Sequence, residues 1–172
     1  DQYLRSFFNY LLIEKGLSSN SIKAYKIDIK KFVSWLSCSN KPSFIKIHES
    51  DLNEYISFMF KNKLSSSSVN RNISSIKAFY LFLIKRKIIN ISPAAEIITP
   101  KQERYLPMSM SELEVEKLLN SPKTSIKIEI RDKAMIEMLY ATGMRISELV
   151  SLKLYNVDIN RCVAKVVGKG SK

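Results

Sequence analysis

Residues 1–92 show a helical periodicity that constrains the fold more strongly than any other feature of this sequence. Apolar side chains recur there at spacings of three and four residues in four successive segments, the pattern of amphipathic helices. Gly16 follows the first segment and the serine run 65–68 precedes the fourth, so both mark helix boundaries. Four such helices with short polar joints can share one core, and we therefore predict a compact four-helix domain.

The second and fourth predicted helices carry basic side chains on the face opposite to their apolar residues. On the second helix, Lys23, Lys26 and Lys30 recur at intervals of three and four residues, so they share one face. On the fourth, Arg71 and Lys77 stand among serines, whose short hydroxyls suit contacts to phosphate. Both faces are candidate DNA-binding surfaces, although a solvated basic helix face has the same pattern.

The charge balance of the chain favours an anionic partner. The 172 residues include 28 Lys+Arg and 16 Asp+Glu, which gives a net charge of +12. Such an excess favours nucleic acid or an acidic membrane surface, and it is also compatible with a basic surface that only aids solubility. Charge alone therefore does not distinguish among these three interpretations.

The pattern changes after residue 92. Pro93, Pro100 and Pro107 interrupt helix formation and stiffen an extended chain, so we predict a linker over 93–107. A second domain is expected over 108–172. It begins with a capping box at Ser111 and Glu114 that opens a short helix.

A longer helix and a strand are expected further along the second domain. The helix should run from about Ile128 to Ala141 and end at Gly143, and a further helix should run from Arg145 to Lys153. Alternation over 162–167 predicts a strand, with a tight turn at 168–170. The residues expected to be buried on the longer helix are Ala134, Met135, Met138 and Leu139.

Arg145 is the most unusual residue of this region. It is predicted in the first turn of a helix, where a positive charge opposes the helix dipole. A bound anion would remove this conflict, because free N–H groups and a guanidinium both suit phosphate. Glu148, three residues later, can hold Arg145 in position. The alternative is a simple surface ion pair between Arg145 and Glu148, which would contribute little to the stability of the fold.

Other classes of site are disfavoured. Cys38 and Cys162 lie far apart in the sequence, and His48 has no neighbouring cysteine or histidine, so we predict no disulfide framework and no metal site. The longest apolar run, Phe79 to Ile84, is far shorter than the ~20 residues of a membrane span. Residues 1–15 carry charge and do not resemble a signal peptide, so a cytoplasmic protein is expected.

Taken together, the motifs resemble the Xer-type tyrosine site-specific recombinases of the phage integrase family. The resemblance covers essentially the whole chain, and the order and spacing of its motifs make it specific. The sharpest motif is Ala-Thr-Gly-Met-Arg-Ile-Ser-Glu-Leu at 141–149. The other matching segments are 16–25 with Asp28 and Phe32, 70–80, 92–94, 106–107, 111–112 and 167–170.

The resemblance implies a fold and a chemistry. The fold would be mainly α: a four-helix, SAM-like core-binding domain whose second and fourth helices approach duplex DNA, then the first helices and first strand of an α+β catalytic domain. Arg145 matches the family's first catalytic arginine, Lys169 its hairpin lysine, and Glu148 an acid that supports the arginine. The family joins DNA through a 3′-phosphotyrosyl intermediate and needs no metal or nucleotide cofactor.

The sequence also departs from the family pattern. The later His-x-x-Arg motif, a further His or Trp and the nucleophilic tyrosine are not found in these residues. We therefore expect an N-terminal fragment that binds DNA without cleaving it, with no nucleophile in this chain. The implied partners are paired recombinase protomers and a DNA translocase, and the implied role is resolution of chromosome dimers at cell division.

Three alternatives remain open at this point. A phage or transposon integrase of the same family would share every motif. A natural short DNA-binding protein that occupies recombination sites is a second alternative, although a terminal strand without a following partner argues against it. A helical protein–protein module with an incidental basic surface is the third.

Overall fold

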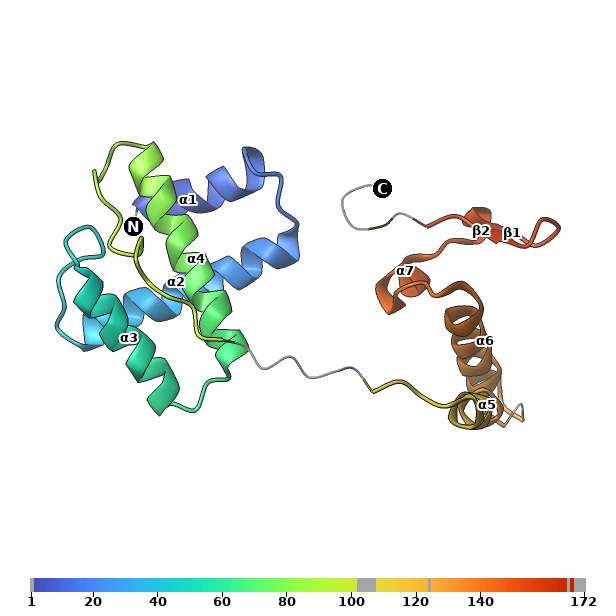
Figure 1. Ribbon diagram of the computed structural model, residues 1–172. Helices are drawn as coiled ribbons and strands as arrows, with labels where there is room; N and C mark the ends of the chain where they lie inside the picture. Colours follow the sequence, from blue (N-terminus) through green and yellow to red (C-terminus); the bar gives the residue numbers. More distant parts are fainter. Residues whose placement is uncertain (1, 102–107, 124, 167, 169–172) are drawn as a thin grey trace. The chain divides into compact units, whose positions relative to one another are not determined.

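The computed structural model describes residues 2–101, 108–123, 125–166 and 168. The chain divides into two compact units, Asp1–Tyr105 and Leu106–Lys172. Figure 1 shows the helices and strands of both units.

The first unit contains the four predicted helices. They are α1 (Gln2–Ile13), α2 (Ser19–Cys38), α3 (Glu49–Lys61) and α4 (Ser66–Lys85). As Figure 1 shows, α4 lies among the other three; it packs against α2 and α3, while α1 packs against α2. The prediction of a four-helix domain is therefore confirmed.

Local side chains and backbone turns define the ends of these helices. Ser18 and Ser65 are the N-cap residues of α2 and α4, and each side chain accepts a backbone hydrogen bond from three residues on. The fourth helix ends at Lys85, because Lys87 adopts a left-handed φ of 55°. The N–H groups of Lys87 and Ile88 then bond carbonyls of the last turn, which closes the helix.

Aromatic rings form the centre of the first unit's core. Phe79 of α4 is fully buried, and its ring centroid lies 5.1 Å from that of Phe7 in α1 and 5.2 Å from that of Phe44 in the α2–α3 loop. Tyr80 is also buried, and its hydroxyl donates to the Phe44 carbonyl at 2.8 Å. Burial raises the pKa of Tyr80, so this hydroxyl keeps its proton to a higher pH than an exposed tyrosine does.

The described part of the predicted linker, residues 93–101, packs on the first unit. Ala94 and Ile97 join the core and are 1% and 5% exposed. The Lys77 ammonium donates to the Ile97 carbonyl at 2.7 Å, and the Asn70 side-chain amide donates to the Pro100 carbonyl at 2.8 Å. The segment is non-helical as expected, but it lies against α4 instead of extending freely.

The second unit begins with helices and continues into a small sheet. Its elements are α5 (Glu112–Asn120), α6 (Lys127–Thr142), α7 (Ile146–Ser151), a 3₁₀ turn (Leu154–Asn156), β1 (Val157–Asp158) and β2 (Val163–Ala164). The capping box is confirmed, because Ser111 accepts from the Glu114 N–H and Glu114 accepts from the Ser111 N–H at 2.8 Å. The mainly α fold that the sequence predicts is likewise confirmed.

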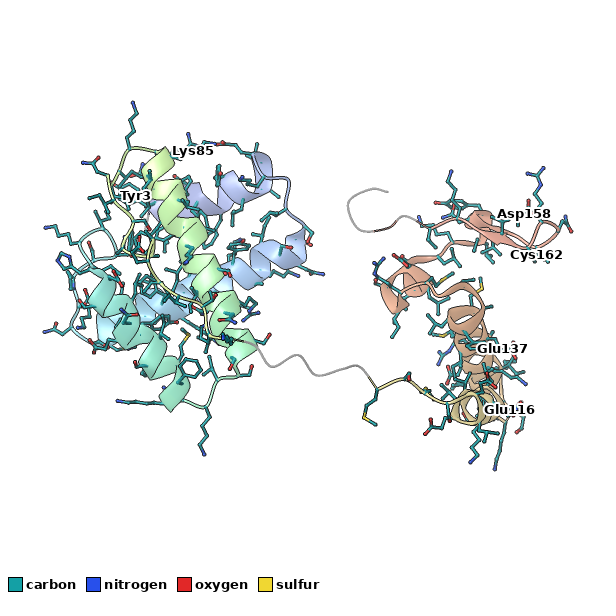
Figure 2. The ribbon with its side chains drawn as sticks, viewed as in Figure 1. Tyr3, Lys85, Glu116, Glu137, Asp158 and Cys162 are labelled. Atoms are coloured by element: carbon teal, nitrogen blue, oxygen red, sulfur yellow. The ribbon has the colours of Figure 1, made fainter. Side chains whose placement is uncertain are left out.

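The sheet differs in detail from the prediction. The strand was expected over 162–167; of its described residues, 162–166, only Val163–Ala164 form a strand, and they pair antiparallel with β1, which the sequence pattern did not reveal. A two-residue strand is too short to show alternation, which is why β1 was missed. Figure 2 shows Cys162 in the turn between the two strands; it and Cys38 are exposed free thiols.

The burial predicted for α6 is wrong at Ala134, which is exposed, whereas Met135, Met138 and Leu139 are half-buried. The reason is that α6 contacts only α5 and α7 extensively, and two neighbours do not enclose a helix face. No described residue of the second unit is fully buried. Within the described part of the chain, no helix is long and apolar enough to cross a membrane.

Candidate functional site

The junction between α6 and α7 places Arg145. Gly143 ends α6 in the left-handed conformation, with φ 64°, and its N–H donates to the Leu139 carbonyl at 2.9 Å. Glycine adopts this conformation without the strain that a Cβ would introduce. Helix α7 starts at Ile146, so Arg145 is its N-cap residue rather than part of its first turn.

Glu148 holds Arg145 through both its backbone and its side chain. One carboxylate oxygen accepts from the Arg145 backbone N–H at 2.7 Å, and the other accepts from its Nη1 at 2.8 Å. The hydrogen bond from the Arg145 backbone N–H and, to a smaller extent, the one from its side chain lower the pKa of Glu148, so the carboxylate stays charged to a lower pH than an ordinary glutamate does. The Glu148 side chain is 11% exposed and that of Arg145 is 70% exposed. The guanidinium is therefore fixed on one edge and open to solvent on the others.

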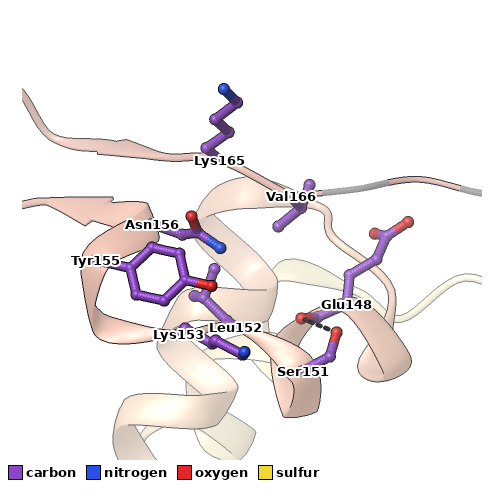
Figure 3. A pocket seen from close by; sticks show the side chains of 8 residues that line it. All are labelled: Glu148, Ser151, Leu152, Lys153, Tyr155, Asn156, Lys165 and Val166. Carbon is purple, nitrogen blue, oxygen red and sulfur yellow. Dashed lines mark hydrogen bonds between the residues drawn. The ribbon is translucent and has the colours of Figure 1, made fainter. Parts of the chain in front are cut away.

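A hollow of about 280 Å³ lies next to Glu148. In Figure 3, Lys165 and Val166, which follow β2, lie across the hollow from the residues between α7 and β1. The N–H of Lys165 donates to the Asn156 carbonyl at 2.8 Å, which holds these two sides together. The lining combines one carboxylate with two lysines: Glu148, Ser151, Leu152, Lys153, Tyr155, Asn156, Lys165 and Val166.

Lys169 lies outside the described residues, so its position relative to Arg145 is not given by the structure. The hairpin that precedes it is described, and β2 ends at Ala164. The predicted catalytic pair of Arg145 and Lys169 therefore stays a prediction, whereas Arg145 and Glu148 are brought together.

The lysines predicted to share one face of α2, here called the α2 stripe, are all exposed to solvent. Lys23, Lys26 and Lys30 form no ion pair with any described carboxylate. The Lys26 ammonium lies 5.5 Å from the ring centroid of Phe8, and Lys30 lines a hollow with Phe8, so both lie beside α1. Their charges are available to an external anion.

The two basic residues of α4 have partners within the unit. Arg71 Nη2 donates to Asp28 at 2.9 Å, yet the Arg71 side chain is still 53% exposed. Lys77 is half-buried and bonds the Ile97 carbonyl, as described above. Sequence reasoning did not place Asp28 on this face, although Asp28 is among the residues that match the family and directly precedes Ile29 on the apolar side of α2.

Comparison with known proteins gives the class of this chain. Residues 4–87 match the family described as phage integrase, N-terminal SAM-like domain, and residues 108–172 match the phage integrase family. The chain belongs to the phage integrase family of tyrosine recombinases, and the resemblance seen in its motifs is confirmed.

Individual relatives carry Xer names. The chain is 37% identical over 166 residues to tyrosine recombinase XerD of Pasteurella multocida, covering 96% of this chain and 56% of that protein. It is 36% identical over 172 residues to tyrosine recombinase XerC of Herpetosiphon aurantiacus, covering 99% of this chain and 56% of the relative. The chain thus spans little more than half the length of these relatives.

A solved structure shares the fold. XerH site-specific recombinase bound to difH substrate, in a pre-cleavage complex, matches with a TM-score of 0.65 and 23% identity over 88% of this chain and 45% of that one. This likeness supports the architecture of the chain, and the XerD and XerC matches support its placement among the Xer-type proteins.

Proposed function

We propose that this chain is the DNA-binding front part of a site-specific tyrosine recombinase. The observation that carries the proposal is the α6–α7 junction, where an exposed arginine is held by Glu148 at a helix N-terminus. This arrangement offers a fixed, planar cation for a phosphate of the DNA backbone. The exposed lysines of α2 and the net charge of +12 support DNA as the partner.

In the proposed reaction, a tyrosine hydroxyl attacks a DNA phosphate, which forms a 3′-phosphotyrosyl bond and frees a 5′ hydroxyl. Arg145 would stabilise the negative charge that develops on the phosphate, and Glu148 would keep Arg145 in place. Lys169 would give a proton to the departing 5′ oxygen. The tyrosine is expected outside these residues, and the assembly on DNA would pair recombinase protomers.

For the biological role we propose resolution of chromosome dimers at cell division, in the cytoplasm and with a DNA translocase as partner. The support is that the curated relatives are named XerD and XerC. Integration of a phage or transposon is the second candidate, because the matching family models carry the phage integrase name. A requirement for a translocase in recombination assays would favour the first role.

Binding to duplex DNA tests the proposed function directly. We expect the chain to bind a short fluorescent duplex of mixed sequence with an affinity that falls steeply as salt rises, because lysine–phosphate contacts release counterions. Fluorescence anisotropy over a salt series measures this slope. Binding without salt dependence, or no binding, would contradict the proposal and favour a protein–protein module.

Covalent chemistry gives a second prediction. Incubated with a nicked suicide substrate, the chain is expected to form no adduct that survives denaturing electrophoresis, since no tyrosine here occupies the family's nucleophile position. XerH site-specific recombinase on a nicked difH duplex is the positive control, because it has been seen in a post-cleavage complex with difH substrate. A denaturation-resistant adduct of this chain would identify one of its tyrosines as a nucleophile and overturn the prediction.

A further inference from the structure

A buried polar cluster joins the two helices that carry the predicted DNA-binding faces. Asp28 of α2 is 0% exposed, yet its carboxylate accepts hydrogen bonds from three side chains of α4. The donors are Arg71 Nη2 at 2.9 Å, Ser75 Oγ at 2.9 Å and Asn72 Nδ2 at 3.4 Å. A carboxylate thus lies in a region where apolar side chains would pack without the cost of removing a charge from water.

Arg71 bridges this buried carboxylate to the surface. One terminal nitrogen donates to Asp28, while the side chain remains 53% exposed. A guanidinium has five N–H donors in a rigid plane, so a fork held on its inner edge by a carboxylate still presents donors on its outer edge. Asp28 therefore limits the orientations that Arg71 can take and points its free donors away from the core.

The surroundings of Arg71 suit a phosphate. Ser74 lies three residues later on α4 and is exposed, and Lys31 lies three residues after Asp28 on α2 and is exposed too. The Ser74 hydroxyl donates its proton to the Asn70 carbonyl at 2.8 Å, so the groups left for a phosphate are the Lys31 ammonium and the Arg71 guanidinium. Neither Arg71 nor Lys31 has any other described carboxylate as an ion-pair partner.

We propose that Asp28 is a positioning residue for DNA binding: its buried carboxylate holds the Arg71 guanidinium so that its outer edge binds a backbone phosphate between α2 and α4. This inference rests on the proposed DNA binding. It assigns to an acidic residue, which by charge alone opposes DNA, a favourable contribution to DNA affinity.

Whether Asp28→Asn strengthens or weakens DNA binding distinguishes a positioning role of Asp28 from a purely electrostatic one. Removing a negative charge should by itself strengthen binding to DNA. Positioning predicts the opposite: about tenfold weaker binding, with the slope of log affinity against log salt reduced by about one, because one phosphate contact is lost. Anisotropy with a short mixed-sequence duplex, over a salt series and with the whole chain, measures both quantities.

Asp51→Asn is the matched control. Asp51 is also a nearly buried carboxylate of the first unit, where it pairs with Lys41 at 3.0 Å and accepts from the His48 N–H at 2.9 Å. It lies on α3, away from Arg71 in the sequence and in its contacts. This variant should bind DNA as tightly as the unmodified chain or more tightly, even where its melting temperature falls.

A double variant tests whether Asp28 acts through Arg71. If it does, Asp28→Asn combined with Arg71→Ala binds no more weakly than Arg71→Ala alone, because the contact is already lost. Independent effects that multiply would contradict the proposal. So would Asp28→Asn binding that is unchanged or tighter, as in the Asp51 control.

If the Asp28→Asn variant does not fold, the Arg71→Lys variant tests the positioning role of Asp28 instead. Lysine keeps the charge but lacks the planar fork, so it cannot serve Asp28 and a phosphate in the same geometry. We expect about tenfold weaker binding at unchanged net charge; equal binding would overturn the proposal. If the unmodified chain shows no salt-dependent binding at all, the proposed function itself fails, which is a distinct result.

Discussion

Replacing Phe79 by alanine is expected to lower the free energy of unfolding of the first unit by about 4 kcal/mol. The Phe79 side chain is fully buried and lies between Phe7 of α1, Phe44 of the α2–α3 loop and Tyr80 of its own helix. Truncation removes these ring contacts and leaves a cavity that rigid neighbours cannot fill. Domains are stable by only about 5–15 kcal/mol, so the loss would be a large part of the total.

Denaturant unfolding followed by tryptophan fluorescence measures this loss in the first unit alone. Trp35 is the only tryptophan of the chain and is 6% exposed in the core of that unit, so its fluorescence reports on the unfolding of the first unit. Leu81→Ala is the control, because Leu81 lies on the same helix but is 64% exposed; it should change stability by less than about 0.5 kcal/mol. Equal effects of the two substitutions would show that Phe79 is not at the centre of the core.

The sequence predicted the first unit well for a physical reason. Its four helices surround one core, so the apolar face of each helix is also its buried face. Ile29 and Phe32 of α2, and Ile73 and Phe79 of α4, are all at most 2% exposed, as their spacing indicated. Helical periodicity is a local property, and a single core translates it into burial without further information.

Long-range contacts were beyond such reasoning. The burial of Asp28 depends on donors supplied from α4, more than forty residues away in the sequence. The bond from Lys77 to Ile97 depends on how residues 93–101 fold back on α4. In both cases the sequence suggests a charged side chain in solvent, whereas the structure gives that side chain a hydrogen-bond partner within the unit. Such a partner is visible only once the fold is known.

In the second unit the local motifs were predicted correctly, whereas the burial of α6 was not. Gly143 and Glu148 have the roles that their spacing indicated, because a left-handed helix end and a reach-back carboxylate are set within a few residues. The apolar residues of α6 are half-buried or exposed, because burial depends on which other elements cover the helix. The catalytic assignment of Arg145 and Lys169 stays a prediction.

Among functional changes, the largest effect is expected from replacing Lys23, Lys26 and Lys30 together by alanine. All three are exposed, and none pairs with a described carboxylate, so their charges can neutralise phosphates. Each lost phosphate contact lowers the salt slope by about 0.9, which gives a fall of about 2–3. Affinity for a short duplex should fall by about one to two orders of magnitude, measured by anisotropy over a salt series.

A control with the same change of charge separates contact from long-range attraction. Lys46, Lys61 and Lys63 are exposed lysines on and around α3, and replacing them by alanine removes three positive charges from the same unit. Long-range attraction alone predicts equal losses for the two triple variants, whereas direct contact predicts a much smaller loss for the α3 set. Equal losses would show that the α2 stripe does not face the DNA. A larger loss for the α2 set would locate the bound phosphates beside α2, and Lys26 and Lys30 would then extend that surface toward α1.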